Sequence, residues 1–529
     1  MIRISGLIVP LRDEKTDLEA AIEKKLRIKI SDLVFYRIVR RSVDARKGRI
    51  HFVYTVDAEI KDNYDSECRL IGQDVVITPD ESYKPATPGK KKMHGRLVIA
   101  GTGPAGLFSA LTLAEAGYRP LLIERGYDAD SRALSVSKFW KTGELDSECN
   151  VQFGEGGAGA FSDGKLTTLI RDPRCRKVLD ELVRCGAPEE ITYSAKPHVG
   201  TDLLRKIVKN IREKIISLGG QVAFRCTLTD IIAGEGGIRE IIVNNTEKIK
   251  TCALILAIGH SARDTFSMIL KRGLNVTPKA FSIGVRIEHP QEMINAAQYK
   301  KFAGHPKLGP AEYKFVYHAS GGRSAYTFCM CPGGYVINAT SEEGCVVTNG
   351  MSNFLRDGKN ANSALLVGIT TEDFESSHPL AGVEFQRVWE RKAFKAGGAN
   401  YIAPAQLVGD FLKNKPSVKA GKVTPTFERA VRFGKLDDCL PDYVIKTLRE
   451  SIPELNKKLK GFSMPEAVMT GVETRSSSPV RILRDENFES NIKGIYPAGE
   501  GAGYAGGIMS AAVDGIRVAE AVIRKFAPE

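Results

Sequence analysis

The stretch Leu97-Val-Ile-Ala-Gly101-Thr-Gly103-Pro-Ala-Gly106 decides the fold, because an apolar run passes directly into a glycine-rich turn. Residues 107–116 continue with helical spacing, and a second apolar run, 120–123, ends at Glu124. This order of strand, tight turn, helix, strand and carboxylate predicts a dinucleotide-binding unit. A G-x-G-x-x-G motif without these flanking elements would not be sufficient for that prediction. The alternative is a glycine-rich turn that binds nothing, and the presence of every part disfavours it.

Each residue type in this turn has its own physical reason. Gly101 permits the tight turn, Gly103 lets the backbone approach a pyrophosphate, and Gly106 lets helix and strand pack closely. Pro104 suits the first helical turn, where its missing N–H is no loss, and the free N–H groups beside it favour phosphate. Glu124 lies about 20 residues beyond the first glycine, where a ribose-binding carboxylate is expected.

Length and composition limit the class of protein. A chain of 529 residues is too long for one core, so two to four domains are expected. Ten cysteines without a paired framework indicate a reduced, cytoplasmic chain, and no signal peptide or membrane span is expected. The net charge of +13 fits solubility, an anionic ligand, an acidic partner or RNA, and charge alone does not separate them.

The pattern along the chain predicts five segments. Residues 1–78 form an N-terminal α+β module, whose arginine-bearing hairpin at 33–60 is a solvated face or, less favoured, a nucleic-acid patch. Residues 79–95 are a linker by composition, and 96–275 are the first part of the dinucleotide-binding domain. Residues 276–464 are an inserted α+β substrate or cap domain, strand-rich to about residue 339, then irregular, then helical near 380–391 and 441–459. Residues 465–529 return to the first domain.

Two further glycine-rich segments support the same interpretation. The first, residues 150–166, is costly to order unless something holds its backbone, and a flat cofactor with its phosphates would do so. The alternative is a mobile lid. The second, residues 494–507, is a strand followed by an acidic glycine turn, and a helix from Ile508 to about Lys525 follows it.

These motifs together resemble FAD-dependent oxidoreductases of the glutathione-reductase-like superfamily, and most closely the poorly characterised FAD-dependent, or NAD(FAD)-utilising, dehydrogenases. The resemblance rests on residues 101–106 with Glu124, 152–166, 259–265, 328–334, 471–479 and 497–500. It implies an α/β protein with a Rossmann-type FAD-binding domain, an inserted α+β substrate or cap domain and a small N-terminal α+β module. It implies FAD as cofactor and no particular substrate.

The resemblance also implies cofactor contacts, with Glu500 in place of the acid, usually Asp, that bonds the ribityl chain or phosphate. The expected cofactor-binding residues are Gly101, Gly103, Pro104, Ala105, Gly106, Glu124, Arg125, Gly157, Ser162, Lys165, Val222, Gly259, Gly499, Glu500, Gly507 and Ile508. Pyridine-nucleotide disulfide reductases carry a second dinucleotide motif and a CxxxxC pair, and this chain has neither. NAD(P)H therefore stays open as the electron donor.

Three residues are candidates for the chemistry around the flavin. Lys165 and Arg475 are basic groups that could stabilise a reduced flavin or bind an anionic substrate, or that form ordinary salt bridges. His260 follows a strand end and is an acid/base or a packing residue. Cys329 and Cys331 are too close in sequence for good disulfide geometry and lack zinc spacing, so ordinary thiols and no metal are expected.

The sequence therefore favours an FAD-dependent oxidoreductase that transfers a hydride between flavin and an unidentified small-molecule substrate. An anionic substrate is one form of this hypothesis. A flavin-dependent RNA-modifying or RNA-associated protein, docking through the N-terminal module, is the alternative. A flavoprotein whose FAD is only structural is a third class. The oligomeric state stays open.

Overall fold

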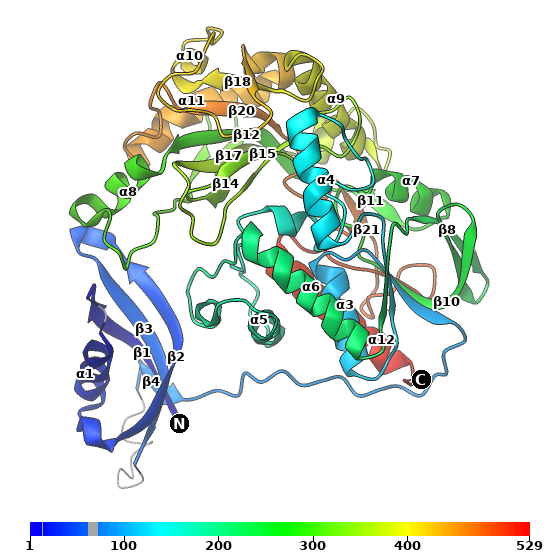
Figure 1. Cartoon of the computed structure of the whole chain (residues 1–529), viewed down its shortest axis with the longest axis horizontal. Coiled ribbons are helices and arrows are strands. Elements are labelled where there is room, and N and C mark those ends of the chain that lie inside the picture. Colours follow the sequence, from blue (N-terminus) through cyan, green and yellow to red (C-terminus); the bar gives the residue numbers. More distant parts are fainter. Residues whose placement is uncertain (13, 62–71, 529) are drawn as a thin grey trace.

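The computed structural model describes residues 1–12, 14–61 and 72–528, and it has three parts joined along one chain (Figure 1). The first part is a four-stranded antiparallel sheet in the order β2-β3-β1-β4, with α1 against one face. Its elements are β1 (Ile2–Pro10), α1 (Lys15–Leu26), β2 (Leu33–Asp44), β3 (His51–Ile60) and β4 (Val75–Ile77). It is the small α+β module that the sequence predicts.

The second part contains a parallel sheet of Rossmann type. Its parallel strands follow the order β7-β6-β5-β10-β22, so the first strand, β5, lies centrally and the chain adds strands on either side of it. β8 and β9 extend the sheet as an antiparallel meander from the start of β10. The strands are β5 (Arg96–Ala100), β6 (Leu121–Glu124), β7 (Gln221–Phe224), β8 (Leu228–Gly234), β9 (Gly237–Val243), β10 (Glu247–Leu256) and β22 (Ile495–Pro497).

This sheet is buried on both faces, and β5 shows why its sequence is continuously apolar. Leu97 and Ile99 enter one core, while Val98 and Ala100 enter the core on the opposite face. Alternate residues of a strand point to opposite faces, so a doubly covered strand needs apolar residues throughout. The helices of this part are α3 (Pro104–Glu115), α4 (Ala129–Thr142), α5 (Arg174–Arg184), α6 (Thr201–Ser217), α7 (Arg263–Lys271) and α12 (Ile508–Lys525).

The third part is built on a second seven-stranded sheet, in the order β13-β14-β17-β12-β20-β18-β19. Its elements are β12 (Phe281–Pro290), α8 (Gln291–Tyr299), β13 (Val316–His318), β14 (Ser324–Cys331), β17 (Asn360–Ile369), α9 (Ala381–Ala396), β18 (Ala403–Leu407), α10 (Val408–Leu412), β19 (Val431–Phe433), α11 (Asp442–Lys458) and β20 (Val468–Glu473). Two small ribbons complete it, β15 (Tyr335–Asn338) with β16 (Thr348–Met351), and β11 (Val276–Pro278) with β21 (Val480–Ile482). The expected α/β class is confirmed.

Two expected boundaries need comment. β20 lies beyond residue 464, where we expected the first domain to resume, yet it pairs with β12 and β18 of the second sheet. We therefore propose that the boundary lies between β20 and β21. Residues 79–95 hold no helix and no strand beyond one bridge at Lys91, but they are docked: Gly89 donates to the carbonyl of Ile523, 2.8 Å away.

Of the helices that the structure describes, none combines the length and the apolar character needed to cross a bilayer.

Candidate functional site

Three loops that contain glycine meet at the carboxyl ends of β5, β10 and β22. A Cβ on Gly501, after β22, would lie 2.5 Å from the carbonyl oxygen of Gly259, after β10. A Cβ on Gly499 would lie 2.7 Å from the Cβ of Ala105, in the turn after β5. β5 is where the strand order reverses, and in open α/β sheets ligands bind at this switch point outside the carboxyl ends. The candidate site is therefore this junction.

Two helices begin at the junction, each after a glycine. α3 starts at Pro104 after Gly103, α12 starts at Ile508 after Gly507, and neither has a side-chain cap. The two helices pack closely because Gly515 of α12 has no side chain (Figure 1). A Cβ there would lie 2.2 Å from the carbonyl oxygen of Ala105 in α3. Uncapped helix N-termini offer free N–H groups and positive dipole ends, which attract anionic ligand groups.

The turn after β5 requires its first and third glycines for packing. Gly101 has a φ of +104°, and a Cβ there would lie 2.3 Å from the carbonyl oxygen of Ala257. A Cβ on Gly106 would lie 1.8 Å from the carbonyl oxygen of Gly101. Gly103 is different, since its Cβ would meet only the Cα of Gly157, at 3.8 Å. The middle glycine therefore leaves backbone accessible, as close approach of a phosphate needs.

A second glycine cluster, residues 150–157 at the start of the segment 150–166, is held by one arginine that the sequence analysis missed. Arg132 of α4 is 1% exposed and donates five hydrogen bonds of 2.7–3.2 Å to backbone carbonyls. The acceptors are Asn150, Val151, Gly154, Glu155 and Gly157. Burial lowers the pKa of Arg132 to about 10, which leaves it charged at neutral pH. The loop is therefore ordered from within the protein and is not a free lid.

Arg132→Met tests this role, because the substitution keeps much of the side-chain bulk and removes every donor. Hydrogen bonds to charged groups contribute about 1.5–3 kcal/mol each, so we expect loosening of residues 150–157 and at least about tenfold weaker cofactor retention. Limited proteolysis of the loop and flavin content after dialysis would measure it. Arg205→Met, at an arginine of α6 that is 56% exposed, is the control. Equal loss in both variants would contradict the role.

Glu124, expected to bind ribose, is 5% exposed and already accepts four hydrogen bonds from the protein. The donors are Thr102 N (2.9 Å), Thr102 Oγ1 (2.7 Å), Gly126 N (3.0 Å) and Gly154 N (2.9 Å). A carboxylate offers about four lone-pair sites. Glu124 therefore fastens the turn after β5 to the second glycine cluster, and a ribose hydroxyl would have to share these positions.

The other expected cofactor contacts lie on the elements around the junction. Arg125 pairs with Asp264 and lies 4.5 Å from the ring centroid of Phe153. Ser162 donates to the Gly159 carbonyl at 2.7 Å, so its hydroxyl serves the loop itself. Val222 lies on β7 beside Leu122, and Gly259 has a φ of +73° with nothing within 4 Å of a Cβ.

Two of the three catalytic candidates lie together. Ser261 joins them, with its Oγ 2.9 Å from Nδ1 of His260 and 3.1 Å from Arg475. The guanidinium group of Arg475 already has partners within the protein. It donates to both carboxylate oxygens of Glu390, at 3.0 and 2.9 Å, and to Ser341 at 2.5 Å. Burial next to Arg475 and Arg263 lowers the pKa of His260 to about 3, so its ring is neutral at physiological pH.

Glu390 of α9 is the centre of this network, and no motif pointed to it. It is fully buried between two guanidinium groups, because Arg263 also binds both of its oxygens, at 2.9 and 2.8 Å. Thr474 adds a hydrogen bond of 2.7 Å. Burial opposes ionisation, but the two arginines hold the pKa of Glu390 well below its ordinary value. The network joins the end of β20 to α7 of the Rossmann part.

Lys165 contacts a different set of residues. Its ammonium group donates to Asp163, at 2.6 Å, and to the carbonyl of Met330. Asp163 is 4% exposed and is also bound by Arg356. Burial opposes ionisation of Asp163, yet Lys165 and Arg356 hold its pKa below the ordinary value. The contacts of Lys165 thus fasten the loop after the second glycine cluster to the second sheet.

Glu500, just after β22, is the carboxyl group at the junction with a strongly shifted pKa. Burial raises the pKa of Glu500 to about 7, against the attraction of Lys279. Lys279, which the sequence analysis did not single out, donates to Ser477 at 3.2 Å, and burial lowers its pKa. A carboxyl group that titrates near neutrality can hold or release a proton at the candidate site.

The shift of Glu500 predicts a pH-dependent stability. Because its folded pKa exceeds the ordinary 4.5, its contribution is fully present below pH 4.5 and is lost as the pH rises through about 7. Glu500→Gln should therefore stabilise the protein at pH 8 relative to pH 5, with a differential slope of at most about 1.4 kcal/mol per pH unit. Thermal unfolding midpoints of both proteins from pH 4.5 to 8 measure it. Parallel pH profiles would contradict the shift.

One group of metal-type ligands is present among the described residues, Glu342, Cys345 and Glu390, with ligand atoms within 4.8 Å of one another. Both carboxylates already bind arginines, since Glu342 pairs with Arg263 and Arg387. Guanidinium groups thus occupy the positions that a cation would need. Cys329 and Cys331 are free thiols, and burial raises the pKa of Cys331.

The chain is similar to known proteins at two levels. Residues 280–476 match the family described as "FAD-dependent protein, C-terminal domain-like", and residues 1–59 match "Domain of unknown function (DUF8436)". A protein of Clostridium beijerinckii named "Uncharacterized protein" is 51% identical over 529 residues, which covers 99% of each chain.

Solved structures resemble it only distantly. A mutant of the E. coli quinol fumarate reductase FrdA is 14% identical with a TM-score of 0.38, over 82% of this chain and 71% of that chain. A glycerol-3-phosphate dehydrogenase of Bacillus halodurans complexed with FAD is 11% identical with a TM-score of 0.34, over 81% and 64%. At these scores the similarity carries no argument about function.

Proposed function

The chain belongs to the family of its full-length Clostridium beijerinckii relative and carries the C-terminal domain of FAD-dependent proteins, and from this premise we propose that it is an FAD-dependent oxidoreductase. In this proposal a hydride passes between bound flavin and a small-molecule substrate that is still to be identified. The FAD lies at the junction of α3, α12 and the second glycine cluster. The finer placement within the NAD(FAD)-utilising dehydrogenases, in the glutathione-reductase-like superfamily, is part of the proposal.

One observation carries it: two uncapped helix N-termini meet across exposed glycine backbone. Nothing lies within 4 Å of a Cβ on Gly506 or Gly507, and only the Cα of Gly157 lies that close to one on Gly103. The donors at α3 suit a pyrophosphate, and those at α12 suit the pyrimidine edge of the flavin ring, which gains negative charge on reduction. The residues present therefore fit FAD.

The chemistry that FAD supplies when bound is hydride transfer, and the protein supplies orientation, charge and protons. Glu500, with a pKa of about 7, would hold or release a proton beside Lys279. His260 would act as a neutral hydrogen-bonding group. Arg475 would act by positioning Ser261 and His260, since four of its donor interactions are already made within the protein.

The predicted role of α12 can be measured as a redox potential. Gly507→Glu places a carboxylate at the helix N-terminus, where like charge disfavours the negatively charged reduced ring. We expect a lower midpoint potential than in the unaltered protein, with FAD still bound. Gly506→Ala, at the neighbouring open position, adds no charge and is the control. An unchanged or higher potential in Gly507→Glu would mean that α12 does not face the flavin ring.

The electron donor and substrate call for a reaction screen. Full-length protein would be mixed anaerobically with NADH, NADPH and a panel of hydroxy acids, amino acids and other small anions, while the flavin absorbance is followed. Bleaching by one compound supports the oxidoreductase proposal, with NAD(P)H as donor if the nicotinamide does it. Bound FAD that no chemical or enzymatic reductant changes would instead support a structural flavin.

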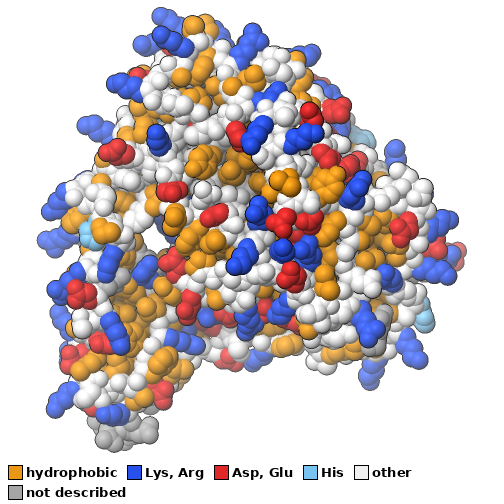
Figure 2. Space-filling model, viewed as in Figure 1, with side chains coloured by type: hydrophobic (Ala, Val, Ile, Leu, Met, Phe, Trp, Pro, Cys, Tyr) orange, Lys and Arg blue, Asp and Glu red, His pale blue; other side chains and the backbone are white. Residues whose placement is uncertain are grey.

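The RNA-related alternative gains no supporting observation. Two arginines of the N-terminal hairpin form ion pairs within the protein: Arg37 binds Asp57, which Arg3 of β1 also binds, and Arg46 binds Asp44. On the face shown in Figure 2, Lys and Arg side chains are spread over the molecule among Asp and Glu. We therefore do not carry this alternative further.

A further inference from the structure

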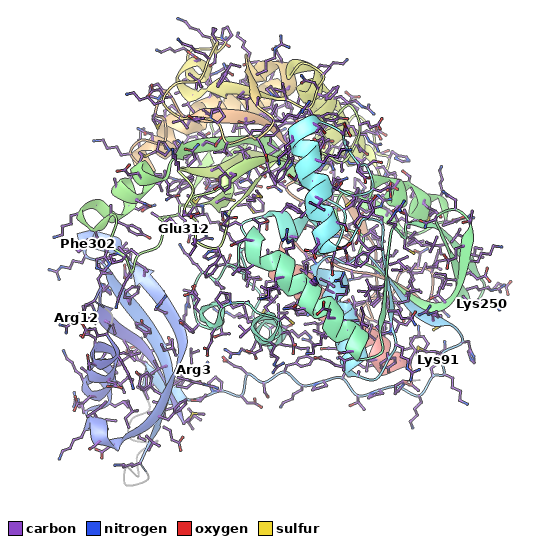
Figure 3. All side chains as sticks on the ribbon, viewed as in Figure 1. Arg3, Arg12, Lys91, Lys250, Phe302 and Glu312 are labelled. Atoms are coloured by element: carbon purple, nitrogen blue, oxygen red, sulfur yellow. The ribbon has the colours of Figure 1, made fainter. Side chains whose placement is uncertain are left out.

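A basic cavity of about 440 Å³ lies at the end of the Rossmann part that is remote from the proposed flavin site. Its walls are the amino ends of β10 and β22, the β8–β9 turn, the end of the linker and the carboxyl end of α12. The 18 residues of α12 span about 27 Å, so the cavity and the junction lie at opposite ends of that helix. Figure 3 shows Lys91 and Lys250 together at this end, far from Arg3 and Arg12 of the N-terminal module.

The walls are fixed by backbone contacts. Ile238 donates to the carbonyl of Lys493 at 2.9 Å, and Lys91 donates to the carbonyl of Lys525 at 3.3 Å. A Cβ on Gly237 would lie 2.4 Å from the Lys493 carbonyl oxygen, so the turn and the loop before β22 touch directly. Four segments far apart in the sequence are thus held in one arrangement.

Charge is concentrated in the lining. Six of its residues are Lys or Arg and one, Glu240, is acidic. Lys525 has a carboxylate partner, Glu489, at 2.6 Å. Within the described part of the chain, no carboxylate lies within 4.0 Å of the charged groups of the other five, which are Lys91, Lys92, Arg239, Lys250 and Lys493.

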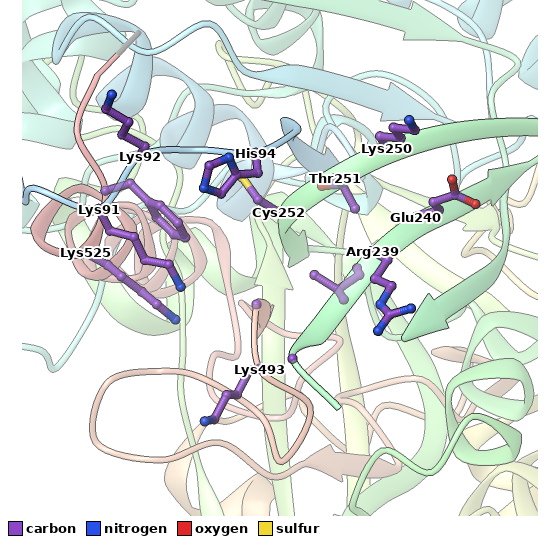
Figure 4. A pocket seen from close by; sticks show the side chains of 14 residues that line it. Lys91, Lys92, His94, Arg239, Glu240, Lys250, Thr251, Cys252, Lys493 and Lys525 are labelled. Atoms are coloured by element: carbon purple, nitrogen blue, oxygen red, sulfur yellow. The ribbon is translucent and has the colours of Figure 1, made fainter. Parts of the chain in front are cut away.

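The carboxyl end of a helix favours nearby cations, and this accounts for Lys91 and Lys525 beside the end of α12. It does not account for Arg239, Lys250 and Lys493, which stand on strands and a loop across the cavity (Figure 4). Cations gathered from opposite walls repel one another, and a bound polyanion would relieve that repulsion.

We propose that this cavity binds a small molecule carrying two or more phosphate groups. The ammonium group of Lys binds phosphate as a point charge, and the guanidinium group of Arg binds it through paired N–H donors. The volume of the cavity is in the range of small-ligand sites. Cations on several walls suit several phosphates better than one. Recognition acts through charge, because Phe526, the one Phe, Tyr or Trp residue in the lining, already contacts Lys91 and Lys525. This site is independent of the proposed flavin site.

Titration calorimetry with inorganic triphosphate on the full-length protein tests the proposal. We expect saturable binding of one triphosphate per chain, at least tenfold tighter than orthophosphate and weaker at higher salt. Lys250→Glu with Lys493→Glu should weaken it at least tenfold. Lys446→Glu with Lys460→Glu, the same charge change on exposed lysines of the third part, should alter it less than twofold.

Lys250→Gln with Lys493→Gln removes charge without reversing it and guards against a misfolded double mutant, and its flavin content and circular dichroism check the fold. Equal losses in the pocket and control variants would overturn the proposal, because they indicate general attraction to a basic surface. Orthophosphate binding as tightly as triphosphate, or poly-glutamate peptide competing equally well, would also overturn it. Flavin binding is unaffected in each case, so failure here is distinct from failure of the proposed function.

Discussion

Gly103→Asp is expected to give folded, colourless protein. The substitution is sterically mild, because a Cβ at Gly103 meets only the Cα of Gly157 at 3.8 Å, an ordinary contact. The added carboxylate would lie at the N-terminus of α3, where the pyrophosphate of FAD is proposed to bind. Two like charges a few ångströms apart without screening water repel strongly. We therefore expect loss of essentially all bound flavin, measured by absorbance and by cofactor release after denaturation.

Gly103→Ala is the matched control for that experiment. It adds the same Cβ without charge, so it should keep the same circular dichroism spectrum and lose less flavin than Gly103→Asp, and the difference between the two variants measures the effect of the charge. Gly106→Ala is not a suitable control, because its Cβ would collide with the Gly101 carbonyl at 1.8 Å. Retention of FAD by Gly103→Asp at the unaltered level would show that the pyrophosphate does not approach this turn.

Glu390→Gln is expected to destabilise the protein by about 3–5 kcal/mol. It removes the charge shared by Arg263 and Arg475, whose side chains are 1% and 3% exposed. Breaking a buried ion pair from one side costs about 3–5 kcal/mol, because the remaining charge stays buried without compensation. We expect a marked fall in the unfolding midpoint, and a change in the flavin environment because Arg475 supports Ser261 and His260.

The control lies on the same helix. Glu384 is 61% exposed and pairs with Arg387 one turn away, so Glu384→Gln should change stability by no more than about 0.5 kcal/mol. Chemical denaturation of both variants, followed by tryptophan fluorescence and circular dichroism, compares them. Similar small effects in the two would mean that the buried arginines find other partners or water.

Much of the Rossmann part could be predicted from sequence because its signals are local. The run Leu97–Ala100, its glycine turn and the helix from Pro104 lie within about 20 residues, and the structure has them as predicted. The third part was harder. β17, a strand in the middle of the second sheet, falls in a region that we expected to be irregular. Its residues Asn360–Ser363 read as polar, and they are buried because β12 and β14 flank them on both sides.

The residues of the candidate site also separate into those with a local sequence signal and those without one. The spacing of the glycines identifies Gly101, Gly103 and Gly106 in the sequence. No such pattern identifies Glu390 or Arg132. Each is a charged residue of an amphipathic helix, and its partners come from distant segments that only the fold brings close. The role of Arg475 depends on Glu390, from a segment 85 residues away, so the sequence alone could not tell a substrate-binding cation from a buried ion pair.

The central claim is that FAD binds where α3 and α12 begin. The most direct test is the flavin content of the purified full-length protein, with the cofactor released by denaturation, identified by mass and counted per chain. We predict one FAD per chain, released without covalent attachment, either as purified or after incubation with FAD. Protein that contains no flavin and takes up none would contradict the claim.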